Sequence, residues 1–496
     1  MVSARALPAF CLAIMAVGDP LRAQCPDGSP PPCGRPAVRA PASNSVAVLY
    51  FDNLSTDTAD AFLADGLTEE IIIRLGQVQR LAVKSRFEVQ RFRGRVASQD
   101  PPALGRALNA AYLVTGSVQR GGDRVRLRVA LVRAATRAQV WGDVIDRTSS
   151  DLLTVESDIA TAVTTAITGQ LLPAERARLT RPLTSDPLAY EAYLHGLQLA
   201  GSSFDEVAQR AAIAEFDRAV ARDPTFAAAY AAASIAWMSL ADGYLPPRDG
   251  YGRAREAALR ALALDSSQAL ASAGLADVVL ALDLDAHEAE RLARRAISLG
   301  ERSSVAQVTL SAILLAQGRI AESVTEARGA WQTDSLISYN SFWYFSVLLY
   351  QRQFDTAAAF LERLGPIVPP ADLRSMRGWL LAEQGQLQRA LPLLNWRYYG
   401  GEYAGAYVRA LVAQGDSLAA RATIDSMLAA RTPGYYNPLA LARAYAAIGD
   451  IDRGMEWLQR AFDERTIWVG WVRVDPELAP LRADPRYAAL DRELKY

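Results

Sequence analysis

The sequence predicts a multidomain chain in which a small α/β domain precedes an all-α superhelical solenoid. Two observations predict this order. Between residues 45 and 170, short apolar runs alternate with helical segments and then give way to strands of alternating polarity. From residue 187 onward, alanine and aromatic residues recur at a fixed helical spacing, which is typical of stacked helix pairs. The 496 residues also exceed what one core supports, since cores stop growing at about 250–300 residues.

The first residues have the pattern of an export signal. A positive Arg5 precedes the apolar run Ala6–Val17, which is too short to cross a bilayer core of about 30 Å as a helix. Ala23 offers a small residue for cleavage. We therefore predict a signal peptide over residues 1–23 and a periplasmic or secreted mature chain without a transmembrane segment.

A linker rich in Pro, Ser and Gly is predicted over residues 24–44. It contains Cys25 and Cys33, whereas the remaining cysteine, Cys11, lies in the signal segment. In an oxidising compartment Cys25 and Cys33 are a disulfide candidate; in a reducing compartment they stay free thiols. Two cysteines without a nearby histidine do not make a zinc site.

Residues 45–170 are expected to fold as an α/β part followed by a β-meander. The expected elements are strand 46–51, helix 59–75, strand 81–83, helix 104–108, strands 111–118, 124–132 and 139–145, and helix 151–169. In the stretch VRLRVALV, alternation places apolar residues on one face and arginines on the other. The apolar face comprises Val125, Leu127, Val129 and Leu131.

Four motifs in this part resemble the TolB amino-terminal-like/FlgO-like domain. They are F-x-N-L-S from Phe51, F-x-A-D-G-L-T-E-x-I from Phe62, Y-L-V-x-G-S-V at 112–118, and A-x-x-W ending at Trp141. The resemblance covers residues 45–170. It implies a non-enzymatic domain for assembly or sensing, of a type often found ahead of tetratricopeptide repeats and behind a cyclase, kinase or DNA-binding output module.

Acidic residues in this domain raise the question of a metal or acid/base site. Asp65 and Glu69 share one helix face and lie close enough to share a cation. Carboxylates in the first half of a helix are also ordinary dipole and solvation chemistry, and we favour this interpretation. The loop 52–58 has no glycine and therefore cannot wrap a phosphate. No metal and no cofactor are expected.

Residues 187–467 carry about eight copies of a helix–turn–helix unit of about 34 residues. The second helix follows the spacing A-x3-F-x2-A-x4-P, first at Ala212, Phe216, Ala219 and Pro224. The inter-helix turns carry glycine, at Gly318, Gly385, Gly415 and Gly449. This part resembles tetratricopeptide-repeat proteins, and the resemblance implies a concave groove for a protein or peptide.

Aromatic residues on first-helix positions are the candidates for binding a partner in that groove. They are Tyr230, Trp237, Tyr339, Trp343, Trp379 and Tyr445. At such spacing, aromatic residues more often form the core between repeats. Residues 468–496 are expected to cap the solenoid, with Trp468 and Trp471 covering the open face of the last repeat.

The expected function is a non-catalytic extracytoplasmic scaffold that binds protein or peptide partners. The two histidines, His195 and His287, lie in no catalytic motif, and no G-x-S-x-G, H-E-x-x-H or Walker sequence occurs, so we expect no enzyme. A carboxylate-only glycosidase would leave no motif and stays open. The net charge of -1 provides no field for nucleic acid. The alternative function is a small-molecule or envelope-state sensor, related to the regulators in which such modules occur together.

Overall fold

The computed structural model describes residues 41–57, 60–84, 86–90, 92–93, 100–148, 154–202, 206–299, 304–333, 338–365, 368–397, 401–430 and 435–496. The predicted signal peptide and the linker up to residue 40, with Cys25 and Cys33, lie outside these residues. Ala42–Tyr496 form one compact unit, and the features below belong to that unit. In the part of the chain that the structure describes, no helix is both long and apolar enough to cross a bilayer.

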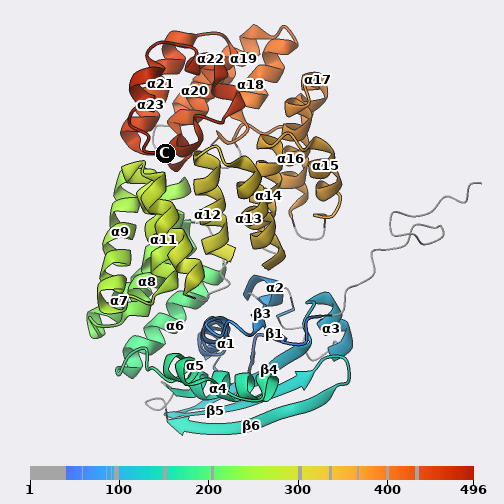
Figure 1. Cartoon of the computed structure of the whole chain (residues 1–496), viewed down its shortest axis with the longest axis vertical. Coiled ribbons are helices and arrows are strands. Elements are labelled where there is room, and N and C mark those ends of the chain that lie inside the picture. The colour runs from blue at the N-terminus through green and yellow to red at the C-terminus, as the bar shows by residue number, and fades with distance from the viewer. Residues whose placement is uncertain are drawn as a thin grey trace, which may run out of the picture. The chain divides into compact units, whose positions relative to one another are not determined.

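A mixed sheet comes first in this unit (Figure 1). Its strands are β1 (Ser45–Val48), β2 (Asp52–Asn53), β3 (Ala82–Val83), β4 (Tyr112–Gly121), β5 (Arg124–Arg133) and β6 (Ala138–Thr148). They lie in the order β3-β1-β4-β5-β6, and β2 also pairs with β4. β1 is parallel to β3 and β4, whereas β4, β5 and β6 are antiparallel neighbours joined by tight turns. The expected α/β part and the meander after it are confirmed.

Helices cover both faces of the sheet. α1 (Ala61–Gly76) and α4 (Val155–Thr168) pack on one face, and α2 (Arg86–Gln90) and α3 (Pro101–Ala107) on the other. The alternation predicted for β5 is confirmed, because its apolar residues are buried under α1 and α4 while its arginines are exposed. The expected strand 46–51 is shorter, since β1 ends at Val48 and a second short strand, β2, follows.

Beyond the sheet, α5 (Pro173–Leu179) leads into helices that stack in consecutive pairs (Figure 1). The pairs are α6 (Pro187–Ser202) with α7 (Glu206–Arg222), α8 (Ala227–Gly243) with α9 (Pro247–Leu264), α10 (Ala269–Val278) and the π-turn η4 (Val279–Asp283) with α11 (Ala286–Ser298), α12 (Ser304–Ala316) with α13 (Ile320–Thr333), α14 (Ser338–Tyr350) with α15 (Phe354–Leu361), α16 (Pro370–Glu383) with α17 (Leu387–Ala390) and η5 (Leu391–Leu393), α18 (Ala404–Ala413) with α19 (Ser417–Ala430), and α20 (Pro438–Ala447) with α21 (Ile451–Glu464). The unit is thus a sheet domain followed by a helical solenoid.

The residues of the repeat pattern lie where helices cross. In α7, Ala212, Phe216 and Ala219 are buried, as small and apolar residues at a crossing must be. The four turn glycines have φ between 74° and 81°, in the left-handed region that glycine enters at no steric cost. Arg352 occupies the turn between α14 and α15 with a φ of 57°, and Leu284 occupies the turn before α11 with a φ of 51°, so these two pairs make the turn without glycine.

The sheet domain and the first helix pairs share one core. α6 packs directly on α1, and a single hydrophobic cluster runs from the sheet through α6, α7 and α8. Arg74 of α1 is buried beneath this contact, where its guanidinium donates to Glu156 of α4 at 2.9 Å and to the carbonyl oxygen of Leu179 at 2.7 Å. The junction is therefore a packed interface.

The acidic face of α1 is buried, which corrects the solvated face expected from the sequence. Asp65, Glu69 and Glu70 are at most 3 % exposed. Each carboxyl group has an arginine partner: Asp65 with Arg93, Glu69 with Arg86, and Glu70 with Arg74. Two of these arginines come from the segment after β3, so the pairs exist only after that segment has packed on α1.

The C-terminal segment packs in two places. Its elements are η7 (Ile467–Trp471), η8 (Pro476–Leu478), α22 (Ala479–Arg482) and α23 (Tyr487–Asp491). α22 and α23 pack on α21, the last helix of the pairs. Trp468 lies by Arg443 of α20, but Trp471 contacts α12 and α14, so it does not cover the last repeat as expected.

Candidate binding site

A small cavity of about 40 Å³ lies where helices of three pairs meet η7. Its walls come from α8, α14, α20, η7 and the residues just before α18. Six of the lining side chains are aromatic: Tyr339, Phe342, Trp343, Tyr350, Trp468 and Trp471. Two of the lining residues, Asp242 and Glu402, are acidic, and one, Arg443, is basic.

Helix α14 supplies most of the aromatic wall because of its spacing. Tyr339, Phe342, Trp343 and Tyr350 recur at helical intervals and therefore lie on one side of the helix. The opposite side, which includes Phe345, belongs to the core between pairs. This division explains why the stretch SYNSFWYFSVLLY is apolar all round.

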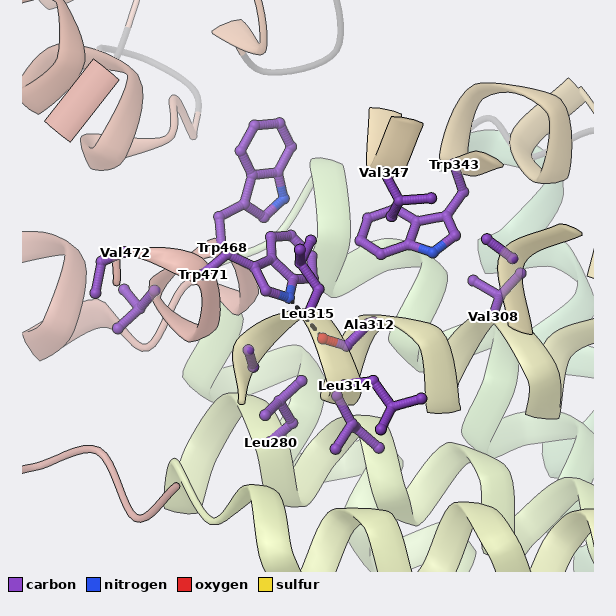
Figure 2. Close-up of a cluster of buried hydrophobic side chains, with 14 of the residues drawn as sticks. Leu280, Val308, Ala312, Leu314, Leu315, Trp343, Val347, Trp468, Trp471 and Val472 are labelled. Carbon is purple, nitrogen blue, oxygen red and sulfur yellow. Dashed lines mark hydrogen bonds between the residues drawn. The ribbon is translucent and has the colours of Figure 1, made fainter. Parts of the chain in front are cut away.

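Two tryptophans of the wall are held by hydrogen bonds to α12, and Figure 2 shows the bond of Trp471. The indole Nε1 of Trp471 donates to the carbonyl oxygen of Ala312 at 2.8 Å. The Nε1 of Trp343 donates to the hydroxyl oxygen of Ser311 at 2.8 Å. The two rings are 5.1 Å apart between centroids. Because both polar edges are satisfied, the apolar ring surfaces can form a fixed wall.

A charged cluster adjoins this cavity. A second cavity of about 20 Å³ shares Tyr350, Glu402 and Arg443 with the first. The buried guanidinium of Arg443 donates from Nε to Asp475 at 2.7 Å and lies 3.9 Å from a Glu477 oxygen. Burial would lower the pKa of Arg443, but Asp475 and the other acids outweigh it, so the pKa is raised and the group stays charged.

Glu402 is a weakly paired acid of the cluster, as is Glu477, whose Oε1 is buried without a hydrogen-bond partner among the described residues. The carboxyl group of Glu402 is 4.0 Å from Nη1 of Arg443, and no donor in the described part of the chain forms a hydrogen bond with it. Burial raises the pKa of Glu402 to about 8; Arg443 opposes that rise, while Asp475 and Glu477 add to it. Burial likewise raises the pKa of Glu477 to about 7.

Further acids lie on the α8 and α10 side. Asp242 accepts a hydrogen bond from the hydroxyl of Tyr251, and burial raises its pKa to about 6. Asp277 accepts from the hydroxyl of Thr309 at 2.8 Å, and burial raises its pKa to about 7, with repulsion from Asp242 adding to the effect. Acids therefore outnumber arginines around the cavity.

The arrangement suits binding. Apolar aromatic walls with a few ionisable groups are the usual composition of a ligand site. Among the described residues, no group of three or more His, Cys, Asp or Glu side chains is placed to hold a metal ion. His195 of α6 lies 3.3 Å from Glu215 and against the ring of Phe62, and His287 is exposed, so neither lines the cavity.

The predicted aromatic residues fall into two groups. Tyr339 and Trp343 line the first cavity, and Trp379 lines the second. Tyr339 is 41 % exposed, whereas Trp343 and Trp379 are buried. These three residues are brought together by the stacking of α14 on α16.

The other three predicted residues lie away from the cavities. Tyr445 is buried in the core of the last pairs. Tyr230 and Trp237 of α8 are half-buried, and arginines of α9 lie over their rings, Arg260 at 5.9 Å and Arg253 at 4.9 Å.

Several lining residues were missed from the sequence. Phe342 and Tyr350 share the face of Tyr339 and Trp343, so helical periodicity was a sufficient signal for them. Glu402 and Arg443 gave no local signal, because they meet only when the segment before α18 packs beside α20.

A wider and shallower cleft of about 760 Å³ lies over β4, β5 and β6. Its lining residues include polar ones from these strands and from β2 before them, such as Asp52, Ser117, Arg128 and Asp143. The exposed Leu54 and Val144 add apolar surface. It is the second place where the described residues could hold a ligand.

The comparison with known proteins gives one curated relative. No family model matches the chain. A stretch of 200 residues, 40 % of this chain, is 31 % identical to "Putative adenylate cyclase 3" of Rhizobium meliloti (strain 1021) and covers 34 % of it. The chain thus spans about a third of the length of that relative. The resemblance to the TolB amino-terminal-like/FlgO-like domain stays a prediction.

Solved structures similar to the chain are helical-repeat proteins. One is YrrB, described as a TPR protein with an unusual peptide-binding site, which is 19 % identical and covers 41 % of this chain and 94 % of its own, with a TM-score of 0.28. Another is PilF of Pseudomonas aeruginosa, which is 17 % identical and covers 41 % of this chain and 94 % of its own, with a TM-score of 0.31. A monomeric IFIT1 mutant with the cap m7Gppp-AAAA is 12 % identical and covers 62 % of this chain and 76 % of its own, with a TM-score of 0.33. At these TM-scores the similarity carries no functional argument, and the solenoid rests on the helix pairs of this chain.

Proposed function

We propose that the chain is a non-catalytic scaffold that binds a protein or peptide partner on the first helices of its helix pairs. The observation that carries the proposal is the aromatic cavity between α8, α14, α20 and η7. Tryptophan and tyrosine dominate the few residues that supply most of the binding energy at protein interfaces. A cavity walled by both is therefore the best candidate for holding a partner side chain.

Tyr339 is the accessible part of this wall. It is 41 % exposed, while Trp343, one turn along α14, is buried. A partner would contact Tyr339 first, and its inserted side chain would then meet the inner aromatic rings. Removing the Tyr339 ring is expected to weaken binding without disturbing the core, because the ring is not part of that core.

The test is affinity capture from an envelope extract with the full chain as bait, followed by mass spectrometry. Tyr339→Ala is expected to lower retention of the partner at least about tenfold, which corresponds to about 1.4 kcal/mol. Val207→Ala is the matched control, since Val207 is 79 % exposed on α7, away from the cavity. Equal retention by both variants would contradict the proposal.

The proposal includes a location outside the cytoplasm. Its support is the apolar run Ala6–Val17 and the Pro-rich linker that follows, which have the pattern of an export signal and a tether. A fusion of the full chain to alkaline phosphatase is expected to be active, because that reporter needs oxidising conditions. An inactive fusion protein retained in the cytoplasm would defeat this part of the proposal.

A second candidate function is a small-molecule sensor. The similarity of 200 residues to a protein named as an adenylate cyclase favours a regulatory role, and the cleft over β4, β5 and β6 offers room for a ligand. Thermal-shift screening with metabolites would test it. A stabilising ligand whose effect disappears in Arg128→Gln would support the sensor over the scaffold, since Arg128 lines that cleft.

A further inference from the structure

Glu402 lines both the cavity of about 40 Å³ and the cavity of about 20 Å³, and its carboxyl group has no hydrogen-bond partner among the described residues. It is 9 % exposed, and the nearest cation, Nη1 of Arg443, is 4.0 Å away. Buried carboxyl groups in proteins are ordinarily hydrogen-bonded or paired, because desolvation of an unpaired charge is costly. The carboxyl group of Glu402 therefore lacks the hydrogen-bond donor that such a group ordinarily has.

The neighbouring arginines donate to other acids and, among the described residues, form no hydrogen bond with Glu402. Arg443 donates to Asp475 at 2.7 Å, and its guanidinium lies 5.3 Å from the ring centre of Trp468. Arg409 donates to Glu383 at 2.8 Å. The cluster around Glu402 thus has more acid than its own cations can neutralise.

The walls of the cavity of about 40 Å³ suit a positively charged group. The faces of aromatic rings attract cations, and tryptophan attracts them most strongly. Trp343, Trp468 and Trp471 line this cavity. Asp242, from α8, adds a second carboxyl group to the same lining. Aromatic rings and two carboxyl groups together make the features of a cation site.

The size of the cavity selects among cations. A volume of about 40 Å³ admits roughly three water-sized groups, at about 10–15 Å³ for each. An ammonium group with its terminal methylenes fits this space. A guanidinium is planar and has four heavy atoms before its stem begins, so it needs more room.

We propose that this cavity binds an ammonium group between its tryptophan walls and the carboxyl group of Glu402. The ammonium belongs to a lysine side chain or amino terminus of a partner peptide, or to a free small amine. This inference deepens and rests on the proposed function, because it names the chemical group that the first helices of the pairs hold. Trp343 and Trp471 are fixed by their hydrogen bonds to α12 and form part of the cavity wall.

Binding is coupled to the release of a proton. Burial raises the pKa of Glu402 to about 8, so its carboxyl group is largely protonated at pH 7. The titratable or charged groups around it are Asp242 of α8, Tyr350 of α14, Glu383 of α16, Arg443 of α20, and Asp475 and Glu477 at η8. An ammonium beside Glu402 favours the ionised form and lowers that pKa. Each bound amine is therefore expected to expel roughly one proton at pH 7.

The experiment is calorimetric titration of the full chain with butylamine at pH 7, in two buffers of different ionisation enthalpy. Saturable binding with release of roughly one proton is expected, and butanol, the uncharged analogue, should not bind. Glu402→Gln should weaken binding at least about tenfold and abolish the proton release. Glu362→Gln is the matched control, since Glu362 is 72 % exposed at the end of α15, and it should leave both unchanged.

Folding of the variants is checked by thermal unfolding, and Glu402→Gln should fold because it removes an unpaired buried acid. Absence of saturable butylamine binding, or equal binding by Glu402→Gln, overturns the ammonium site. Titrations with lysine-containing peptides and with their Nε-acetylated forms distinguish a peptide ammonium from a free small amine as the bound group. Tighter binding of the free-lysine peptide than of butylamine supports a peptide source. Binding of butylamine but of no peptide supports the site while refuting the peptide-binding scaffold.

Discussion

Gly66 of α1 lies directly against Leu194 of α6. A Cβ atom added at Gly66 would come within 2.5 Å of the Cβ of Leu194 and 2.9 Å of its carbonyl oxygen. Gly66 belongs to the sheet domain and Leu194 to the first helix of the solenoid, so the contact lies at the junction between the two. Only a residue without a side chain lets the two helices approach this closely.

Gly66→Ala is therefore expected to destabilise the protein. Because the added methyl group meets the backbone of α6, the helices must separate, and overpacking of this kind costs about 1–3 kcal/mol. The melting temperature should fall by several degrees. Gly76→Ala is the control, since nothing lies within 4 Å of a Cβ at that position. Equal melting temperatures for both variants would contradict the close contact.

Arg74→Met is expected to be more damaging. The change leaves Glu156 and Glu70 buried without their cation, and breaking a buried pair in this way costs about 3–5 kcal/mol. Urea unfolding measures the loss. Arg210→Met breaks an exposed pair with Glu206 and should cost less than about 1 kcal/mol. If the two losses were alike, Arg74 would not be the buried partner described.

Glu402 makes stability depend on pH. Its pKa is about 8 in the folded protein, against 4.5 as the ordinary value, because burial disfavours the charged form. The folded state thus holds the proton more tightly, so the stability from this group is complete below pH 4.5 and is lost as pH rises through about 8. We expect the melting temperature to fall between pH 4.5 and pH 8.

Glu402→Gln should reduce that fall, since glutamine does not titrate. Glu477, whose pKa burial raises to about 7, contributes in the same direction and should retain part of the slope. Differential scanning calorimetry across the pH range provides the comparison. Parallel curves for the wild type and the variant would show that Glu402 does not titrate as described.

Trp471→Phe and Trp471→Ala separate two contributions to the position of η7. Phenylalanine keeps a ring beside Trp343 but loses the hydrogen bond to Ala312, at a cost of about 1 kcal/mol. Alanine also removes the buried ring, and such a truncation costs about 3–5 kcal/mol. Limited proteolysis should cut the segment after α21 faster in the alanine variant. Unchanged cutting would mean that the ring does not hold the segment.

Local patterns predicted the elements well. Alternation along β5 identified Val125 and Leu127 as buried, and helical spacing identified Ala212 and Ala219 at a crossing, because each pattern reports the periodicity of one element. The same signal gave Tyr339 and Trp343 of α14, although not Phe342 and Tyr350 on the same side. These features depend only on neighbours in sequence, because the repeat of a strand or helix decides which side chains share its buried face.

Relations between distant elements could not be predicted. Trp471 and Ala312 are 159 residues apart, and nothing in either stretch indicates that they share a hydrogen bond. The arginines that bury Asp65 and Glu69 come from another segment, so the acids had the pattern of a solvated face. Glu402 owes its raised pKa to the elements that enclose it. Such properties depend on how elements stack.

The return of the C-terminal segment to the third and fourth helix pairs changes how the protein folds. In an ordinary solenoid each repeat contacts only its neighbours, and unfolding can proceed one repeat at a time. Here η7 reaches η4 and α12, and the backbone N–H of Lys495 donates to the carbonyl oxygen of Leu284 at 2.8 Å. Residues made later during synthesis thus complete the packing of helices made much earlier. The middle pairs and the end of the solenoid should therefore melt in one cooperative transition.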